Sequence, residues 1–190
     1  MELVTERLIL REMVAEDWRA VLEVERDPAV VRYLTQEPAT ETSARAYVDR
    51  IIAAAREEPR TTFDFAITER GGDGRLLGRC GLGRKASEPR IAAVWYVLSS
   101  TCRRRGYATE AAREVLRFAF EDLALHRVYG DVDPRNPDSA RVLERLGMRR
   151  EAHHVDDVWI KGEWCSTWIY ALLADEWRKR SETTPQQKAR

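Results

Sequence analysis

The spacing of apolar residues in the first half of the chain switches between a period of two and a helical period. Leu8 and Leu10 alternate with polar neighbours, which is typical of a strand, whereas Trp18, Val21 and Leu22 recur at helical spacing. The patterns predict a strand over 5–12, a helix that ends at Pro28, a helix over 42–58, and two strands, 61–69 and 75–84, separated by the turn-forming segment RGGDG.

The second half of the chain continues the alternation. It predicts a strand over 90–99, a helix over 107–123, a strand over 126–133, a short helix over 137–146, a strand-rich stretch over 148–173 and a last helical turn or two over 174–180. This order is typical of a mixed sheet with helices packed against it, so we expect an α/β (α+β) fold. Residues 1–180 carry no repeat or linker and form one expected domain, followed by a polar, disordered tail over 181–190.

Composition and charge narrow the range of partners. The 190 residues are 44% hydrophobic, which suits one packed core, and 32 basic residues balance 32 acidic ones. A chain without net charge has no overall field that attracts nucleic acid or an anionic membrane, so any anion site has to be local.

The start has no signal-peptide pattern, no apolar run approaches about 18 residues, and three scattered cysteines fit a reducing compartment. We expect a cytoplasmic protein.

A local anion site is predicted where residues 103–106 (RRRG) lead into the helix that begins at Tyr107. A helix start presents free backbone N–H groups and the positive end of the helix dipole, and a glycine there permits close approach of the backbone to a ligand. Arginine side chains beside these amides add charge-assisted donors that suit a pyrophosphate. The alternative interpretation is that Arg103, Arg104 and Arg105 are solvated loop residues.

A second candidate segment is the start of the short helix over 137–146. Asn136 stands at a favourable N-cap position before Pro137, and Gly147 follows the last turn, so helix capping alone accounts for these residues. Ser139 lies three residues after Asn136, which places both side chains at the same end of the helix. If that end faces a ligand, an amide and a hydroxyl converge on it.

Together, the segments RRRGYATEA and NPDSARVLERLGM resemble the GNAT superfamily of acyl-CoA-dependent N-acetyltransferases. Residues 103–108 match its (Gln/Arg)-x-x-Gly-x-(Gly/Ala) motif for the pyrophosphate of CoA. The segments TERLILRE and WIYALLADEW, with the Asn136-x-x-Ser139 element, look like the RimJ/RimL branch in particular. The resemblance covers roughly residues 3–178. It implies the GNAT fold, a mixed, mostly antiparallel central sheet that is splayed in the middle and flanked by helices.

The resemblance also implies an activity, the transfer of an acetyl group from acetyl-CoA to a primary amine without a metal. Backbone N–H groups near Val97 and Leu98 would stabilise the oxyanion, and Ser139 is the expected catalytic residue, a proton donor to the leaving thiolate. The strand that carries Val97 would splay from its neighbour over 128–133 to admit the cofactor. The expected cofactor-binding residues are Val97, Leu98, Arg103, Arg104, Arg105, Gly106, Tyr107, Ala108, Thr109, Asn136 and Ser139.

The acceptor side is less defined by the sequence. Candidates for a general base are Asp133, His153, His154, Asp156, Asp157 and Glu163. RimJ/RimL relatives often carry an acidic residue soon after a turn like residues 162–164 (GEW), whereas Cys165 follows that turn here. The acceptor is therefore left open among a protein N-terminus, an amino acid, a polyamine and an amine-bearing antibiotic. Another donor such as succinyl-CoA, and a noncatalytic CoA-binding module, are the alternative interpretations, and both a monomer and a homodimer fit.

Two further groups of residues have less specific patterns. The three histidines and three cysteines lack the spacing of zinc ligands, so no metal site is expected. Aromatic residues concentrate near the end of the chain, where we expect them to pack in the core, with an acceptor pocket or a dimer surface as alternatives. These residues are Trp159, Trp164, Trp168, Tyr170 and Trp177.

Overall fold

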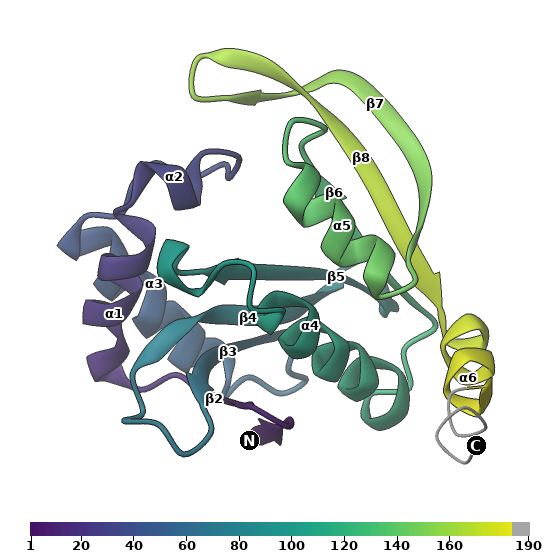
Figure 1. The fold of residues 1–190 in the computed structure, drawn as a ribbon, viewed down its shortest axis with the longest axis horizontal. Helices are drawn as coiled ribbons and strands as arrows, with labels where there is room; N and C mark the ends of the chain where they lie inside the picture. The colour runs from purple at the N-terminus through teal and green to yellow at the C-terminus, as the bar shows by residue number, and fades with distance from the viewer. Residues whose placement is uncertain (184–190) are drawn as a thin grey trace.

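A computed structural model describes residues 1–183, which form an eight-stranded sheet with helices on both faces (Figure 1). The strands are β1 (Glu2–Val4), β2 (Leu8–Glu12), β3 (Thr62–Glu69), β4 (Leu76–Lys85), β5 (Glu88–Leu98), β6 (Arg127–Val132), β7 (Arg149–Ile160) and β8 (Glu163–Leu173). The α-helices are α1 (Trp18–Glu25), α2 (Pro28–Val31), α3 (Glu41–Ala54), α4 (Tyr107–Arg117), α5 (Pro137–Arg145) and α6 (Ala174–Thr183). The predicted α/β class and the flanking helices are confirmed.

Several helix boundaries differ from the sequence prediction, and the helix expected over 42–58 already ends at Ala54. Pro28 does not end a helix: α1 stops at Glu25, and Pro28 is the first residue of α2. Proline suits that position, because the first turn of a helix does not use its N–H groups, and the Asp27 carboxylate caps α2 by accepting a bond from the N–H of Ala29 at 2.9 Å. The helix expected over 107–123 also changes character, because α4 ends at Arg117 and a π-helical turn, Phe118–Asp122, follows.

The strand order of the sheet is β1-β2-β3-β4-β5-β6-β8-β7. Every neighbouring pair is antiparallel except β5 and β6, which are parallel. The connection between these two strands contains α4, as a crossover between parallel strands requires. The sheet is therefore mixed and mostly antiparallel, as expected, and its only parallel pair among the described residues lies in the middle.

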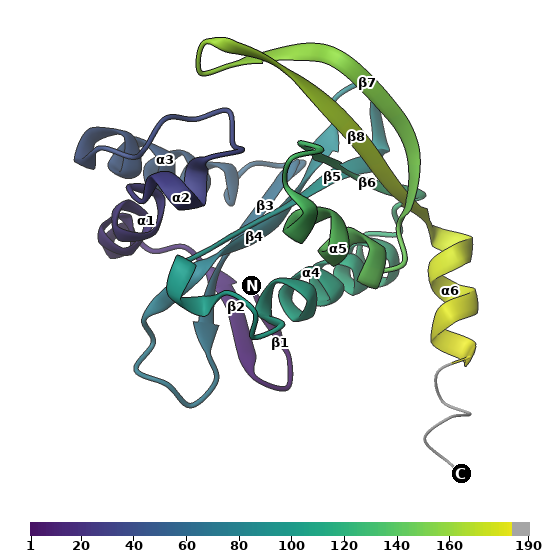
Figure 2. The same ribbon diagram turned by 45° about the horizontal axis from the view of Figure 1, so that its top comes forward.

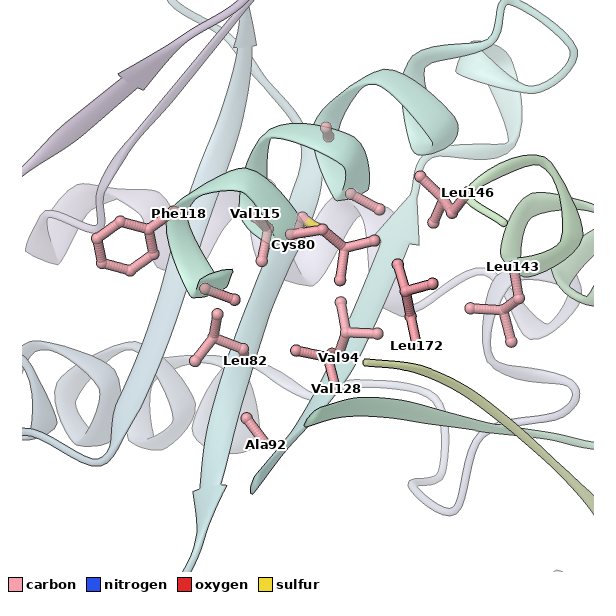
Figure 3. Packing of buried hydrophobic residues seen from close by; sticks show 14 of the residues in the cluster. Cys80, Leu82, Ala92, Val94, Val115, Phe118, Val128, Leu143, Leu146 and Leu172 are labelled. Carbon is pink, nitrogen blue, oxygen red and sulfur yellow. The ribbon is translucent and has the colours of Figure 1, made fainter. Parts of the chain in front are cut away.

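Alternation along the strands builds one core on each face of the sheet. Phe65 and Ile67 of β3 face the side covered by α4 and α5, whereas Ala66 between them faces α1 and α3. Figure 3 shows the larger core, where Val115 of α4 and Leu143 of α5 pack over Leu82 and Val94. Both faces are thus covered around the central strands, which fixes the positions of the segments that follow β5 and β6.

The hairpin of β7 and β8 arches over the sheet toward α2 (Figures 1 and 2). At its tip, the ammonium of Lys161 donates a hydrogen bond of 2.6 Å to the backbone carbonyl of Val31. This contact joins two segments that are 130 residues apart in the chain.

Within residues 1–183, none of the helices is both long and apolar enough to cross a membrane. The expected tail begins inside α6, and residues 184–190 lie outside the described part.

Candidate active site

The central feature of the site is the separation of β5 from β6. The two strands pair through only three residues each, and Ala93 with Tyr129 is the last pair. Beyond it, β5 stays beside β4 as far as Leu98, and β6 stays beside β8 as far as Val132. The edge of β5 over residues 94–98 therefore turns backbone donors and acceptors toward β6 without pairing to it. The splay expected from the resemblance is present, and Val97 and Leu98 lie on it.

The loop that follows β5 delivers the start of α4 to this edge. Gly106 adopts a left-handed conformation with φ of 79°, which glycine accepts without steric cost. It stands at the N-cap of α4, and no side chain caps the helix there. Because the first N–H groups of a helix have no acceptor within it, the amides after Gly106 are available to an external anion.

The three arginines of the loop are exposed, and the structure separates their roles. The guanidinium of Arg103 donates to the backbone carbonyl of Ala29 in α2 at 2.7 Å. Arg104 has φ of 62°, a left-handed conformation uncommon outside glycine. The backbone carbonyl of Arg105 accepts a bond of 3.0 Å from Arg7. The three arginines therefore do not form one basic cluster. Their backbone forms a turn with a left-handed residue, and the side chain of Arg103 contacts α2.

The first turn of α4 is clamped by the segment before β2. The Glu110 carboxylate accepts a hydrogen bond from the Thr5 hydroxyl at 2.6 Å and from Nε of Arg7 at 2.7 Å. Burial acts to raise the pKa of Glu110, but these bonds outweigh it and hold the pKa below its ordinary value. The Arg7 guanidinium also lies 4.8 Å from the centre of the Tyr107 ring. Glu110 therefore stays ionised while Arg7 balances its charge beside the helix start.

The predicted residues Asn136 and Ser139 lie at the start of α5. Asn136 is the N-cap, and its side-chain oxygen accepts a bond of 3.2 Å from the N–H of Ser139. The capping role expected from local sequence is present. The Ser139 hydroxyl lies 2.9 Å from the phenol oxygen of Tyr96, which is the residue before Val97 on β5. Tyr96 thus links the splayed edge of β5 to the start of α5.

The general-base candidates fall into two groups. Asp133 and Glu163 share one partner, because Arg135 bonds the Asp133 carboxylate at 2.7 Å and the Glu163 carboxylate at 2.8 Å. Burial acts to raise the pKa of Asp133, and the bonds from Arg135 outweigh it, so that pKa is lowered. The other candidates are exposed residues of β7, namely His153, His154, Asp156 and Asp157. The structure therefore does not bring all six together.

A buried ionic cluster lies on the α1 and α3 face of the sheet. Nε of Arg79 bonds the Glu25 carboxylate at 2.5 Å, and Asp64 accepts bonds from the Tyr47 hydroxyl and from the indole of Trp95. Only 1% of Asp64 is exposed, and burial raises the pKa of this carboxyl above its ordinary value. The cluster ties both helices to the strands behind the splay.

The remaining chemical groups carry no site of their own. The cysteines Cys80, Cys102 and Cys165 are free and buried. Across the described residues, no group of histidine, cysteine, aspartate and glutamate side chains is arranged to hold a metal ion. Trp177 and Tyr170 pack in the core as predicted, whereas Trp159 and Trp164 are more than half exposed on the β7 and β8 hairpin.

Sequence reasoning singled out the loop and the α5 start as candidates, but it missed the residues that contact them. No local pattern pointed to Tyr96, because its contact with Ser139 depends on how β5 and α5 pack. Thr5 and Arg7 belong to the segment TERLILRE, which contributed to the resemblance, but their contact with Glu110 could not be predicted because it spans more than 100 residues of sequence.

Comparison with known proteins agrees with this geometry. Residues 7–149 match the model of the acetyltransferase (GNAT) domain. The chain is 32% identical to the uncharacterized N-acetyltransferase YnaD of Bacillus subtilis, over 93% of this chain and 99% of that protein. It is 25% identical to the spermidine N(1)-acetyltransferase of Escherichia coli, over 82% of this chain and 80% of that protein.

A solved structure of a GNAT-family acetyltransferase from Bacillus anthracis superimposes with a TM-score of 0.82 at 29% identity. The superposition covers 93% of this chain and 100% of that one. The sheet splayed between β5 and β6 and the uncapped start of α4 lie within the region that the domain match covers. The chain therefore belongs to the GNAT acetyltransferase family and is an acyl-CoA-dependent transferase.

Proposed function

We propose that this protein transfers an acetyl group from acetyl-CoA to a primary amine by direct attack within a ternary complex. The observation that carries the proposal is the meeting of two unpartnered backbone surfaces, the β5 edge over residues 94–98 and the uncapped start of α4. One suits an extended chain of amides, and the other suits a phosphate. CoA contains both, joined in one molecule.

The residues of the loop fit a pyrophosphate. The amides of Arg105 to Thr109 would bind it, because they surround the left-handed Gly106 at a helix start that no side chain caps. Arg104 and Arg105 are exposed and can add charge, while Arg103 is engaged with α2. The side-chain charge of this loop is therefore secondary to its backbone amides.

The edge of β5 fits the pantetheine arm of CoA. Backbone groups of Val97 and Leu98 would pair with its amides in the manner of an added strand. The N–H groups of the same segment would stabilise the oxyanion that forms when the amine attacks the thioester carbonyl. The amine attacks the thioester directly, and no covalent enzyme intermediate is needed. Much of the remaining acceleration would therefore come from holding the amine and the thioester in contact.

Ser139 is the proposed catalytic residue. Its hydroxyl lies at the start of α5, 2.9 Å from the phenol oxygen of Tyr96, and the side chain of Asn136 accepts a bond from the backbone N–H of Ser139. A thiolate released in the splay would find this hydroxyl as a proton donor. Asn136 would contact the cofactor directly or through a water molecule in addition to capping α5.

The acceptor is a primary amine whose identity stays a proposal. The RimJ/RimL-like segments favour a protein N-terminus, and the similarity to a spermidine N(1)-acetyltransferase favours a polyamine. For proton removal from the amine, Asp133 and Glu163 are favoured over the β7 residues, because Arg135 gathers them at the end of β6. We place the protein in the cytoplasm, since its cysteines are all free and acetyl-CoA is available there.

A thiol-release assay tests the proposal. Acetyl-CoA is offered with peptides that have free N-termini, amino acids, polyamines and aminoglycosides, and the acceptor is then examined by mass spectrometry. We expect free CoA to appear with one class of amine, together with one added acetyl group on that amine. Free CoA without an acetylated product would contradict transfer to an amine.

The acyl donor is tested in the same assay. Succinyl-CoA replaces acetyl-CoA at equal concentration, because the loop and the β5 edge contact parts of CoA that both donors share. We expect a higher kcat/KM with acetyl-CoA. A higher kcat/KM with succinyl-CoA would retain amine acylation and overturn the acetyl assignment.

A further inference from the structure

Tyr96 contacts two oxygen atoms of Ser139 through its single hydroxyl. The phenol oxygen of Tyr96 lies 2.9 Å from Oγ of Ser139 and 3.0 Å from the backbone carbonyl oxygen of Ser139. The Tyr96 ring packs against the core below α4 and α5, which fixes the place of its hydroxyl. Both acceptors are therefore within reach of one phenol that does not have to move.

A phenol has a single proton, so Tyr96 can donate to only one of these two oxygens at a time. When Tyr96 donates to the carbonyl of Ser139, the Ser139 hydroxyl donates to the phenol oxygen and its proton is engaged. When Tyr96 donates to Oγ of Ser139, the serine proton is free to bond elsewhere. The two arrangements differ only by rotation of two O–H bonds, with every heavy atom in place.

We propose that Tyr96 is the positioning residue for Ser139: by donating to Oγ, its hydroxyl directs the serine proton to the sulfur of the leaving thiolate. This inference rests on the proposed function, because it requires Ser139 beside the thioester. As the amine nitrogen bonds to the acetyl carbon, the C–S bond breaks and its electron pair stays on sulfur. The serine proton moves to sulfur, the amine passes a proton to solvent through the proposed base, Asp133 or Glu163, and Ser139 recovers its proton from solvent.

The chemistry of a partly buried phenol suits this task. Negative charge develops on Oγ of Ser139 as its proton leaves, and a hydrogen bond to a charged oxygen is about twice as strong as one between neutral groups. Burial raises the pKa of Tyr96 far more than its bond to Ser139 lowers it. The phenol therefore keeps its proton around neutral pH and can act as a donor during the reaction.

Asn136 completes the arrangement from the other side. Its side chain accepts a bond from the N–H of Ser139, which adds to the constraint that α5 places on the serine backbone. The N–H and Oγ of Ser139 are then both held by neighbouring side chains, and only the hydroxyl proton is free to change partner.

A double-mutant cycle with a matched control tests the proposal. The variants are Tyr96→Phe, Ser139→Ala, the double variant, and Tyr170→Phe, in which a buried tyrosine loses its bond to Glu144 of the same helix. We expect Tyr96→Phe to lower kcat by roughly tenfold, the scale of one hydrogen bond to a charged group. KM for acetyl-CoA should stay within about twofold, and the double variant should match Ser139→Ala, because the two residues act as one unit.

The outcomes separate positioning from packing. Multiplied losses in the double variant, or an equal loss of kcat in Tyr170→Phe, would overturn the role of Tyr96, because either result reports a general effect of loosening α5. Melting temperatures of the two Tyr→Phe variants provide the check on folding, and we expect similar decreases.

If no amine is acetylated, the same variants are compared by the slow hydrolysis of acetyl-CoA, in which the leaving thiolate is the same. The Tyr96 effect seen there would support its role and refute only the amine acceptor, and its absence would refute both.

Discussion

Arg7 bonds Glu110 across 103 residues of sequence, with 2.7 Å between Nε and the carboxylate. The pair joins the turn before β2 to the first turn of α4, and Thr5 adds a third contact to the same carboxylate. The segment TERLILRE, which looked like a family signature in the sequence, therefore has a physical task. It sets the direction of the helix start that would bind the pyrophosphate of CoA.

Replacing Thr5 tests this clamp without altering any charge. Thr5→Val removes the hydroxyl that bonds Glu110, and we expect the free energy of unfolding to fall by about 1–2 kcal/mol. Acetyl-CoA affinity should fall by roughly threefold, or about 0.7 kcal/mol, because the amides of α4 lose part of their orientation. Calorimetry and urea unfolding measure both, and the exposed Thr61→Val is the control, in which neither value should change. Full affinity in a destabilised Thr5→Val would show that the clamp serves folding alone.

Gly106 is tested against a glycine with the same backbone conformation. Gly106 has φ of 79° and Gly74, in the turn before β4, has φ of 78°. Valine at either position should cost about 1–3 kcal/mol of stability through backbone strain. Only Gly106→Val should also weaken acetyl-CoA binding, by at least about tenfold or 1.4 kcal/mol, since it disturbs the amides after it. Equal affinities of the two variants in calorimetry would refute the assignment of this loop to the pyrophosphate.

Much of the fold could be predicted because local pattern and global structure agree. The strand around Leu8 and the capped helix after Asn136 follow from alternation and capping, which depend on neighbouring residues. Pro28 was misread because a proline is compatible with the end of one helix and with the start of the next. The pairing of Tyr96 with Ser139 and of Arg7 with Glu110 depends on how distant segments pack, and no local pattern encodes it.

Ser139→Ala tests the proposed proton donor. We expect kcat to fall by roughly 10²-fold, at the lower end of what a positioned acid contributes, while KM for acetyl-CoA changes little. The reason is that Ser139 would act on the leaving thiolate and not on the bound cofactor. Steady-state kinetics on the best amine measure both constants, and Ser166→Ala on β8 is the control. A variant that keeps full kcat would remove Ser139 from the chemistry.

The buried ionic cluster predicts that replacing Arg79 of β4 lowers stability far more than replacing Arg75, which lies just before β4. Arg79→Met leaves Glu25 and Asp64 as buried carboxylates without their cation, so the free energy of unfolding should fall by about 3–5 kcal/mol. Arg75→Met removes the exposed pair with Glu23, where both side chains are about 60% accessible, and no measurable change is expected. Urea unfolding compares them. Similar stabilities would mean that the cluster does not hold α1 and α3 to the sheet.

The pH dependence of stability tests the pair of Asp133 and Arg135. The pKa of Asp133 is lower in the folded protein than in the unfolded chain, because bonds from Arg135 outweigh the effect of burial. Its contribution is therefore fully present above the ordinary value of about 4 and is lost as pH falls through the lowered pKa. We expect wild type to be more stable than Asp133→Asn at pH 7, and this difference to shrink below about pH 4. Arg135→Met should weaken this pH dependence, since it removes the guanidinium bonds and leaves only the bond of 2.8 Å from the backbone N–H of residue 135. A difference between wild type and Asp133→Asn that stays constant from pH 7 to about pH 3 would contradict the pairing.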